Sequence, residues 1–408
     1  MTGIEATADP AELGFDAERL ARIDRRLGRF VDDGRLAGWQ AVVSRRGQVV
    51  HASCYGRRDV ANDLPIEPDT LFRIYSMTKP ITSVAAMMLW EQGEFLLTDP
   101  ISKWLPEFAE PRVYVAGSDL APATVPAIEP IRVHHLLSHT AGLTYGFTRT
   151  HPVDARYRSA GLDEFAPSER TLAQMSQAWA AQPLVYQPGA EWLYSVATDV
   201  LGRLIEVISG VPLDAFFDKQ LLGPLGMTDT SFVVAEDDRG RLAELYNATP
   251  DGFAKSTAAG AAVLTPRWLA GGHGLVSSAA DYHRFSQLLL RGGELDGIRL
   301  LAPSTLALMT TNQLPDGADL ASFGRPLYAE TPLRGVGFGY GLSRTIDVAA
   351  SGMAGSVGDF GWGGLASTAF VVDPARELTM LFFTQLIPST ALPLRPLLRQ
   401  LVHQAIID

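Results

Sequence analysis

The stretch LFRIYSMTKPITSVAAMMLWEQG, residues 71–93, changes from a strand-like pattern to a helical one near Ser76. The predicted helix runs to about Gly93, a residue type that commonly ends helices. Pro80 fits this helix only if it begins near Ser76, because the missing N–H then belongs to the unpaired first turn. Ser76 and Lys79 are therefore expected on one face of a helix N-terminus.

Ser76 and Lys79 form the only S-x-x-K pattern in the chain, which has four lysines among its 34 Lys and Arg residues. A serine hydroxyl is a poor nucleophile until a base removes its proton. Arginine cannot be that base, whereas lysine can if burial or nearby positive potential lowers its pKa. The helix N-terminus would supply such potential and free backbone N–H groups. The alternative is a helix cap beside a solvated lysine.

Composition narrows the function classes. The chain has 408 residues, 47% of them hydrophobic, and a formal net charge of −11. This is ample for a large core and predicts two or three domains, or one large domain with an insertion. The sequence has no basic stripe, which argues against nucleic-acid binding. It also has no apolar run near the roughly 20 residues that span a bilayer.

The N-terminal stretch has no basic segment followed by an apolar one, so no secretory signal is predicted. Cys54 is the only cysteine, so an internal disulfide is impossible, which fits a reducing compartment. We therefore expect a cytoplasmic protein with Cys54 buried or half-buried in a strand; a catalytic Cys54 is the weaker alternative.

The remaining elements follow from hydrophobic periodicity and turn residues. Strand pairs are expected at 38–59, turning at Arg45-Arg46-Gly47, and at 365–385, turning at Asp373-Pro374. Helices are expected at 16–35, 197–210, 212–227, 277–292 and 393–407. Loops are expected at 111–131 and 311–336.

This order predicts an α/β fold of the α+β type, in which terminal helices flank an antiparallel sheet and a mostly helical domain is inserted. Residues 1–93 and 250–408 form the predicted sheet domain, and residues 94–249 form the inserted helical domain. We expect the active site between the two.

Several motifs resemble those of the serine β-lactamase and penicillin-binding superfamily, in which S-x-x-K carries the nucleophile. Besides Ser76-Met77-Thr78-Lys79, the similar stretches are HHLLSHTAGL (134–143), QPGAEWLYS (187–195), WLYSVATDVLG (192–202) and GWGGLAS (361–367). Tyr194 stands at the tyrosine of the family's Tyr-x-Asn element, and Trp362-Gly363-Gly364 stands at its Lys-Thr-Gly strand. The resemblance extends over nearly the whole chain and implies a β-lactamase/transpeptidase-like fold.

Two positions depart from the β-lactamase pattern. Val196 replaces the Asn that binds the substrate's side-chain amide, and Trp362 replaces the Lys that favours the substrate carboxylate. Both changes remove recognition of an anionic lactam or peptide and leave an apolar, aromatic-walled pocket. With Trp-Gly-Gly, the pattern looks most like the family VIII carboxylesterases. A related acyltransferase group shares the same Ser, Lys and Tyr.

The resemblance implies a role for each matching residue. Ser76 would be the nucleophile, Lys79 its base partner and Tyr194 a second acid/base; which of the two takes the serine proton first is left open. Backbone N–H groups of Ser76 and Leu365 would form the oxyanion hole, and the glycines would let substrate approach the strand. The implied substrate-binding residues are Trp362, Gly363, Gly364, Val196 and His273. No metal or cofactor is expected.

Ordinary structural roles compete with some of these assignments. Tyr194 could simply open a helix with its hydroxyl bonded to a neighbour, and Trp362 could pack in the core. His135 and His139 have a spacing that can bind zinc on a helix, but they lack the glutamate of H-E-x-x-H, which favours structural histidines.

Other residues could belong to a different kind of site. AGSVG (354–358) nearly matches the nucleophile elbow G-x-S-x-G, but no helix is predicted after it, so Ser356 is expected in a loop. His273 has no nearby partners for a Ser-His-Asp triad. Tyr145, Phe147 and Tyr340 either shape an acyl pocket or pack in the core.

The leading hypothesis is a serine hydrolase that cleaves small-molecule carboxylic esters with short acyl chains through an acyl-serine. An acyltransferase or an amidase would use the same residues, and weak β-lactamase activity could accompany either. A non-catalytic, penicillin-recognising binding protein is the remaining alternative, although it predicts a broken catalytic set. No nucleic-acid or membrane partner is expected.

Overall fold

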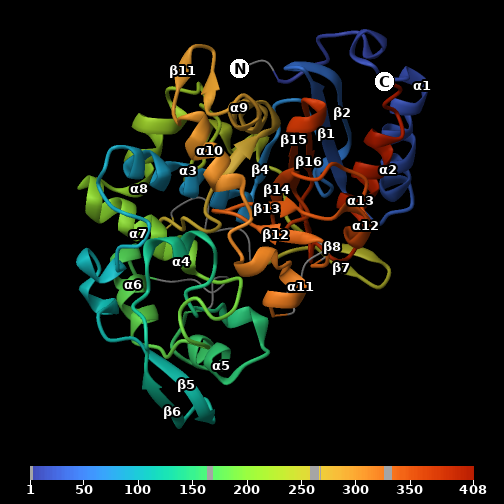
Figure 1. The fold of residues 1–408 in the computed structure, drawn as a ribbon. Coiled ribbons are helices and arrows are strands. Elements are labelled where there is room, and N and C mark those ends of the chain that lie inside the picture. Colours follow the sequence, from blue (N-terminus) through green and yellow to red (C-terminus); the bar gives the residue numbers. More distant parts are fainter. Residues whose placement is uncertain (1–2, 163–168, 258–265, 267, 326–332) are drawn as a thin grey trace.

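The central feature is an eight-stranded sheet with the order β12-β13-β14-β15-β16-β1-β2-β3 (Figure 1). The structure is a computed structural model that describes residues 3–162, 169–257, 266, 268–325 and 333–408. The eight strands are β1 Gly38–Arg45, β2 Gln48–Asp59, β3 Leu64–Pro65, β12 Val336–Phe338, β13 Ser343–Thr345, β14 Phe360–Gly363, β15 Ala369–Asp373 and β16 Leu378–Phe383. Every pairing in this sheet is antiparallel, as predicted.

Both predicted strand pairs are confirmed. β1 and β2 turn through Arg46 and Gly47, which have φ values of 50° and 78°. β15 and β16 turn through Pro374–Arg376, where Asp373 caps the short 3-10 helix. Cys54 lies half-buried on β2, as expected. β1 also pairs with β16, so strands from the two ends of the chain lie side by side in the middle of the sheet.

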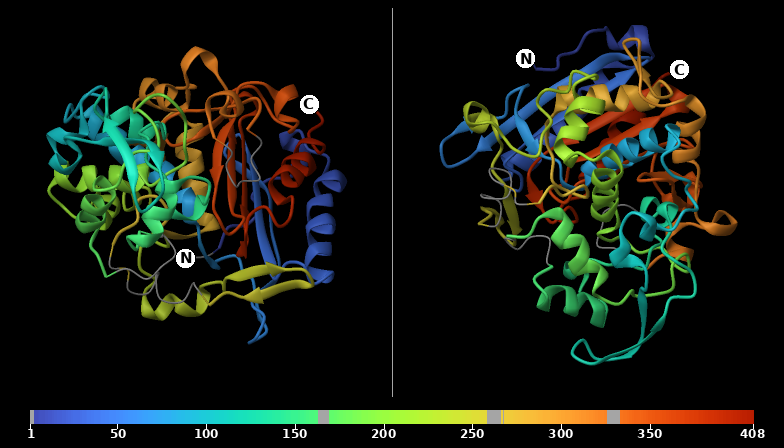
Figure 2. Two further views of the ribbon diagram at one scale, coloured as in Figure 1. Left: turned by 90° about the horizontal axis from the view of Figure 1, so that it is seen from below. Right: turned by 90° about the vertical axis from the view of Figure 1, so that its left-hand side faces the viewer.

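The two faces of the sheet carry different helices (Figures 1 and 2). Met380 and Phe382 of β16 point to one face, where they join the core of α2 (Arg22–Asp32) and α13 (Leu394–His403). Leu381 and Phe383 point to the other face, where α9 (Ala279–Leu290) packs on β15 and β16. This alternation is that of a strand buried on both sides.

The helical part of the chain packs around α7 (Ala197–Ser209). Its helical neighbours are α3 Thr78–Glu91, α4 Val133–Leu137, α6 Leu172–Ala180 and α8 Leu213–Phe217, and α3 is buried along nearly its whole length. The helix α5 (Pro152–Ser159) packs next to the 3-10 helix Gly146–Thr148. The predicted end of α7 is confirmed, because Gly210 caps it in the left-handed conformation. The predicted cap of α9 is confirmed too, since the Ser278 hydroxyl accepts the Asp281 N–H. No described helix is long and apolar enough to cross a bilayer.

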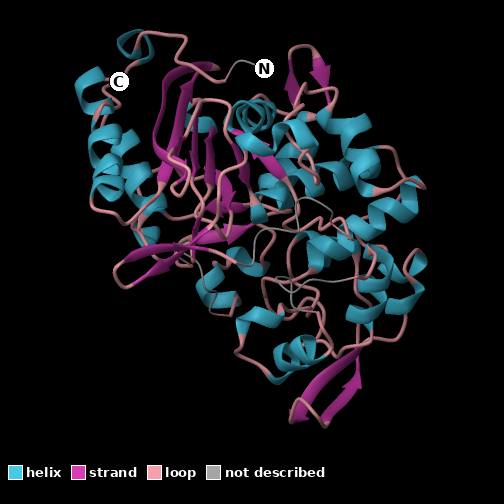
Figure 3. Ribbon diagram, turned by 180° about the vertical axis from the view of Figure 1, so that it is seen from behind, coloured by secondary structure: helices cyan, strands magenta, loops and turns pink. Residues whose placement is uncertain are grey.

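Smaller elements complete the fold (Figure 3). They are α1 Ala17–Leu20, β4 Leu71–Arg73, β7 Tyr246–Thr249, β8 Gly252–Lys255, β9 Val276–Ser278, β10 Glu294–Leu295, β11 Ile298–Arg299, α10 Pro303–Thr310, α11 Leu320–Phe323, α12 Val348–Ser351 and β17 Leu386–Ile387. The proposed domain boundaries at residues 93/94 and 249/250 stay a prediction.

The prediction of a loop at 111–131 was wrong. Here the chain forms the hairpin of β5 (Arg112–Gly117) and β6 (Pro122–Pro126), which projects from the body (Figure 1). The prolines that suggested a loop occupy the two ends of β6, which is an edge strand and tolerates residues without an N–H. The loop predicted at 311–336 contains α11, and its residues 326–332 lie outside the described residues.

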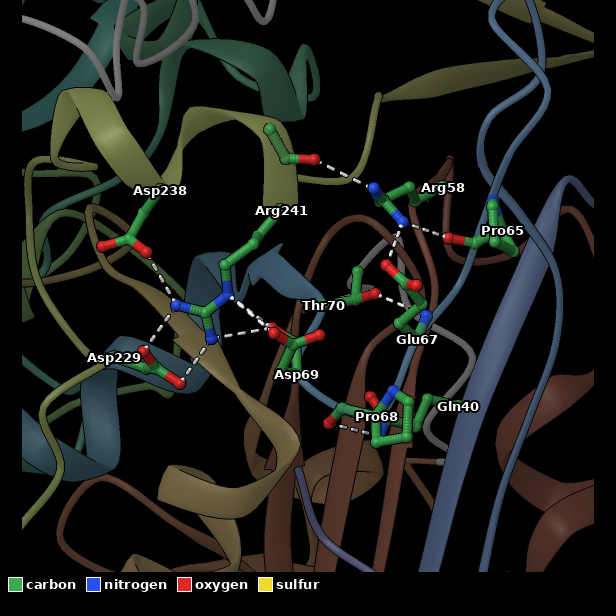
Figure 4. Close-up of polar contacts among 11 residues, drawn as sticks. Gln40, Arg58, Pro65, Glu67, Pro68, Asp69, Thr70, Asp229, Asp238 and Arg241 are labelled. Carbon is green, nitrogen blue, oxygen red and sulfur yellow. Dashed lines mark hydrogen bonds and ion pairs between the residues drawn. The ribbon is translucent and has the colours of Figure 1, made fainter. Parts of the chain in front are cut away.

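A polar cluster holds the segment that leads into β4 (Figure 4). The Arg241 guanidinium donates to the Asp229 and Asp238 carboxylates at 2.8 and 2.9 Å. It also donates to the Asp69 backbone carbonyl at 2.8 Å. Arg58 donates to the Glu67 carboxylate at 2.6 Å. These contacts tie residues 67–70 to the body just ahead of the strand that ends near Ser76.

Candidate active site

Ser76 lies at the corner between β4 and α3. β4 pairs with β9, and the Ile74 N–H then donates to the Leu275 carbonyl at 3.1 Å. The backbone turns at Tyr75, whose φ of 44° is unusual for a residue with a side chain. A short 3-10 helix, Tyr75–Met77, precedes α3, which starts at Thr78, two residues later than predicted. This corner leaves Ser76 partly exposed above a buried Lys79.

Lys79 contacts three acceptors at once. Its Nζ lies 3.3 Å from the Ser76 Oγ, 3.0 Å from the Tyr145 hydroxyl and 2.8 Å from the Gly272 carbonyl oxygen. Only 1% of the lysine is exposed. An ammonium has three protons to donate, so these contacts suit the protonated amine. Loss of the proton that faces Ser76 would leave a lone pair directed at the serine hydroxyl, held in place by the other two contacts.

Tyr194 forms a wall beside the lysine. Lys79 Nζ lies 4.4 Å from the centre of the Tyr194 ring, close enough for a cation–π contact. The Trp362 indole N–H, from β14, donates to the Tyr194 hydroxyl at 3.3 Å. The buried His139 packs against the other side of the tyrosine, with ring centres 4.9 Å apart. The structure thus brings Ser76, Lys79, Tyr194 and Trp362 together, and their roles stay predictions.

A buried carboxylate lies behind Lys79. The Asp199 Oδ1 accepts the Gly272 N–H at 2.8 Å, and the carbonyl of the same glycine accepts from Lys79. Burial raises the pKa of Asp199 to about 6, with the Lys79 charge opposing that rise. His273 Nδ1 lies 3.9 Å from this carboxylate, and burial together with the Lys79 charge lowers the histidine pKa to about 3. His273 is therefore neutral at pH 7.

Asp199→Asn is expected to stabilise the protein near pH 8 and not near pH 4. An aspartate whose pKa is raised on folding destabilises the folded state when it is ionised. The cost is complete above the pKa of the folded state, about 6, and disappears below the pKa of the unfolded state, 3.8. The shift corresponds to roughly 3 kcal/mol at most, reduced by the weaker bond that an amide oxygen makes to Gly272. Urea unfolding at both pH values measures the difference.

Asp281→Asn provides a matched control for that experiment. Burial also raises the pKa of Asp281 to about 6, but its carboxylate bonds to Thr230, away from Lys79. Relative to the wild type, both variants should show a gain in stability that grows with pH. An Asp199→Asn gain that does not vary with pH would contradict the assignment of a charged Asp199 at pH 8.

The end of β14 lies against the chain just before Ser76. A Cβ atom at Gly364 would overlap the Ile74 carbonyl oxygen, so only glycine permits this approach. The Gly364 N–H donates to the Thr368 carbonyl at 2.9 Å and closes the turn that contains Leu365. Within the described part of the chain, the N–H groups of Ser76 and Leu365 donate no hydrogen bond, as free oxyanion-hole donors require.

Two of the predicted substrate-binding residues, Gly363 and Val196, have packing roles in the structure. A Cβ atom at Gly363 would overlap the Arg395 guanidinium, so this glycine faces α13. Val196 is fully buried at the start of α7 and presents no exposed surface. His273 is partly exposed and packs on Trp268, with ring centres 5.3 Å apart. The contacts of all three with substrate stay predictions.

The alternative sites gain no support. His135 lies on α4 and its Nδ1 accepts the Arg132 N–H, whereas His139 follows the helix with φ of 55° and packs on Tyr194. Among the described residues no group of three or more His, Cys, Asp or Glu could hold a metal. The Ser356 hydroxyl donates to the buried Asp373 carboxylate at 2.6 Å, in a loop.

Sequence reasoning missed two contacts of Lys79. Tyr145 was expected only as a pocket or core residue, yet its hydroxyl contacts the lysine directly and its ring stacks on Phe147 at 4.8 Å. The link from Asp199 through Gly272 was not foreseen. Asp199 lies five residues after Tyr194, in the first turn of α7, where a carboxylate ordinarily indicates helix stabilisation.

The sequence of this chain is similar to those of several known proteins. The model of the family described as beta-lactamase matches residues 23–403 of the chain. The chain belongs to the beta-lactamase family. Esterase EstB of Burkholderia gladioli is 33% identical over 93% of this chain and 94% of its own. Monacolin J acid methylbutanoyltransferase of Aspergillus terreus is 28% identical over 98% of this chain and 96% of its own.

The fold of this beta-lactamase family member has close structural matches. A solved structure described as EstCE1, a hydrolase with promiscuous acyltransferase activity, has a TM-score of 0.80 and 28% identity. The match covers 95% of this chain and 99% of that one. These findings confirm the predicted β-lactamase-like fold, and the relatives of this chain include proteins named as an esterase and as an acyltransferase.

Proposed function

We propose that the protein is a serine carboxylesterase that works through an acyl-Ser76 intermediate. The observation that carries the proposal is the contact between Ser76 Oγ and a buried Lys79 whose other two contacts fix its position. Nucleophile and base are thereby within hydrogen-bond reach, with the base oriented by further groups. Tyr194 and two free backbone N–H groups complete the set needed for acyl transfer.

The proposed cycle has two halves. Lys79 takes the Ser76 proton while Oγ attacks the ester carbonyl, and the oxyanion binds the N–H groups of Ser76 and Leu365. The carbonyl re-forms as the alkoxide leaves with a proton delivered through Tyr194. Water then attacks the acyl-serine, losing its proton to the same pair, and Ser76 leaves with its proton restored and the acid released.

The proposed substrates are uncharged esters with short acyl chains. Tyr194 and Tyr145 lie beside Lys79, and they pack on two further aromatic rings, Trp362 and Phe147 respectively. Trp362 carries no charge, so its position does not favour a substrate carboxylate. The similarity to a protein named Esterase EstB supports the same substrate class. A small-molecule ester is accordingly the proposed partner of the site.

The wild-type protein is expected to hydrolyse p-nitrophenyl butyrate and to lose that activity when a fluorophosphonate labels Ser76. The phosphonate traps an activated serine, because its adduct resembles the tetrahedral intermediate. Initial rates measure the hydrolysis, and peptide mass spectrometry locates the label. Folded protein that neither turns over ester nor is labelled at Ser76 would contradict the proposal.

Acyl transfer is the second candidate, because one relative is named a methylbutanoyltransferase and EstCE1 is described as having promiscuous acyltransferase activity. An acyl-serine can be attacked by an alcohol as readily as by water if the alcohol is held in the site. Product analysis of the same assay with a competing alcohol separates the two. Free acid alone indicates a hydrolase, and a new ester indicates transfer.

A further inference from the structure

Arg395 reaches the active-site strand from behind. It lies in the first turn of α13, on the sheet face opposite to Trp362 and Tyr194. Its Nη2 donates to the Gly364 carbonyl at 2.6 Å and to the Thr368 carbonyl at 3.1 Å. These two carbonyls begin and end the turn that follows β14, so one guanidinium group holds both ends of the turn.

The residues around Arg395 leave room for its side chain. Gly363 packs directly on the guanidinium, where any Cβ atom would overlap it. Arg395 also lines a cavity between the sheet and α13, beside the apolar Met380 and Leu398. An arginine stays protonated under all ordinary conditions, so its positive charge on the Gly364 carbonyl is permanent.

The contact falls on the peptide unit that contains the Leu365 N–H. This peptide bond is trans, since the cis bond found in the described chain is Ile387–Pro388. In a trans peptide the C=O and N–H point in opposite directions. The Gly364 C=O points to Arg395, so the Leu365 N–H points to the other side of the strand, where Gly364 abuts Ile74 and Ser76 follows.

We propose that Arg395 is a positioning residue for the oxyanion hole, acting through the Gly364–Leu365 peptide. Donation to both carbonyls fixes the orientation of the Leu365 N–H. Donation by a cation to the Gly364 carbonyl also polarises the peptide and strengthens the N–H as a donor. The inference rests on the proposed acyl-serine function, because that function assigns Leu365 its role.

The test compares Arg395→Gln with Arg395→Lys in the full chain. Arg395→Gln should lower kcat for p-nitrophenyl butyrate about tenfold with little change in KM, since the oxyanion forms only in the transition state. The affinity of n-butylboronic acid, whose tetrahedral adduct with Ser76 occupies the same hole, should fall in proportion. Arg395→Lys, which keeps the cationic donor, should recover most of both losses.

Arg344→Gln is the matched control. Arg344 lies on the neighbouring β13 and donates to the Thr310 backbone carbonyl at 2.7 Å, so the variant loses one charge and one similar bond. It should keep wild-type kcat and boronate affinity. If Arg395→Gln behaves like Arg344→Gln while the wild type is active, the inference is overturned. An inactive, unlabelled wild type would instead overturn the proposed function.

Discussion

Ser76→Ala is expected to lower kcat/KM for p-nitrophenyl butyrate by roughly 10⁵-fold, because no other group can form the acyl intermediate. The side chain is partly exposed and its Oγ contacts Lys79 at 3.3 Å, so its removal should not unfold the protein. Steady-state rates measure the loss, and intact-protein mass spectrometry shows whether an acyl group is retained. The thermal unfolding midpoint of the variant should stay near that of the wild type.

Ser356→Ala supplies the control for Ser76→Ala, since Ser356 is the other serine with a nucleophile-like sequence. Its hydroxyl donates to the Asp373 carboxylate, and Arg376 pairs with that carboxylate. This variant should keep wild-type turnover, although the buried Asp373 loses a partner and stability falls. Substantial activity in Ser76→Ala, or loss of activity in Ser356→Ala at unchanged folding, would place the nucleophile elsewhere.

Lys79→Arg is expected to lower kcat by roughly 10³-fold or more while preserving the positive charge. An arginine keeps its proton, so it cannot serve as base for Ser76. Lys79→Met tests the same point with a side chain of similar length that carries no charge and no proton acceptor. If activity depends on a base, both variants should be inactive; if it depends on charge alone, Lys79→Arg should stay active.

Lys103→Arg is the matched control for this pair. Lys103 is about half exposed and pairs with Asp99, whereas Lys79 is buried. The exchange should leave turnover unchanged, because an exposed pair of this kind contributes little. Wild-type rates for Lys79→Arg, with folding confirmed by circular dichroism, would show that Lys79 is not the base.

Much of the fold could be predicted because its signals are local. The hairpin at 38–59 and the capped helix at 277–292 depend on turn residues and hydrophobic spacing within a few positions. The error at 111–131 has the same origin, because alanines and prolines in a two-stranded ribbon resemble a loop in composition. Only the partner strand reveals the difference.

The contacts of the site also differ in how far apart their residues lie in the sequence. Ser76 and Lys79 are three residues apart, so local helix geometry brings them together, and the structure places Tyr194 and Trp362 beside them. Tyr145 meets Lys79 across 66 residues of sequence, and no local pattern marks that contact. Gly363 shows the limit most clearly. The approach of substrate to Gly363 stays a prediction, and no local pattern marks the contact of this glycine with Arg395 from the last helix.

The pairing of β1 with β16 also bears on how the molecule is made. During synthesis β1 and β2 are the first strands of the sheet to leave the ribosome. The edge of β1 that does not pair with β2 has no partner strand until residues 378–383 follow. An exposed edge of this kind invites pairing with other chains. Since β14 and α13 also come late, the growing chain cannot assemble the proposed oxyanion hole early. On the proposed function, the appearance of ester hydrolysis would therefore report completion of the sheet.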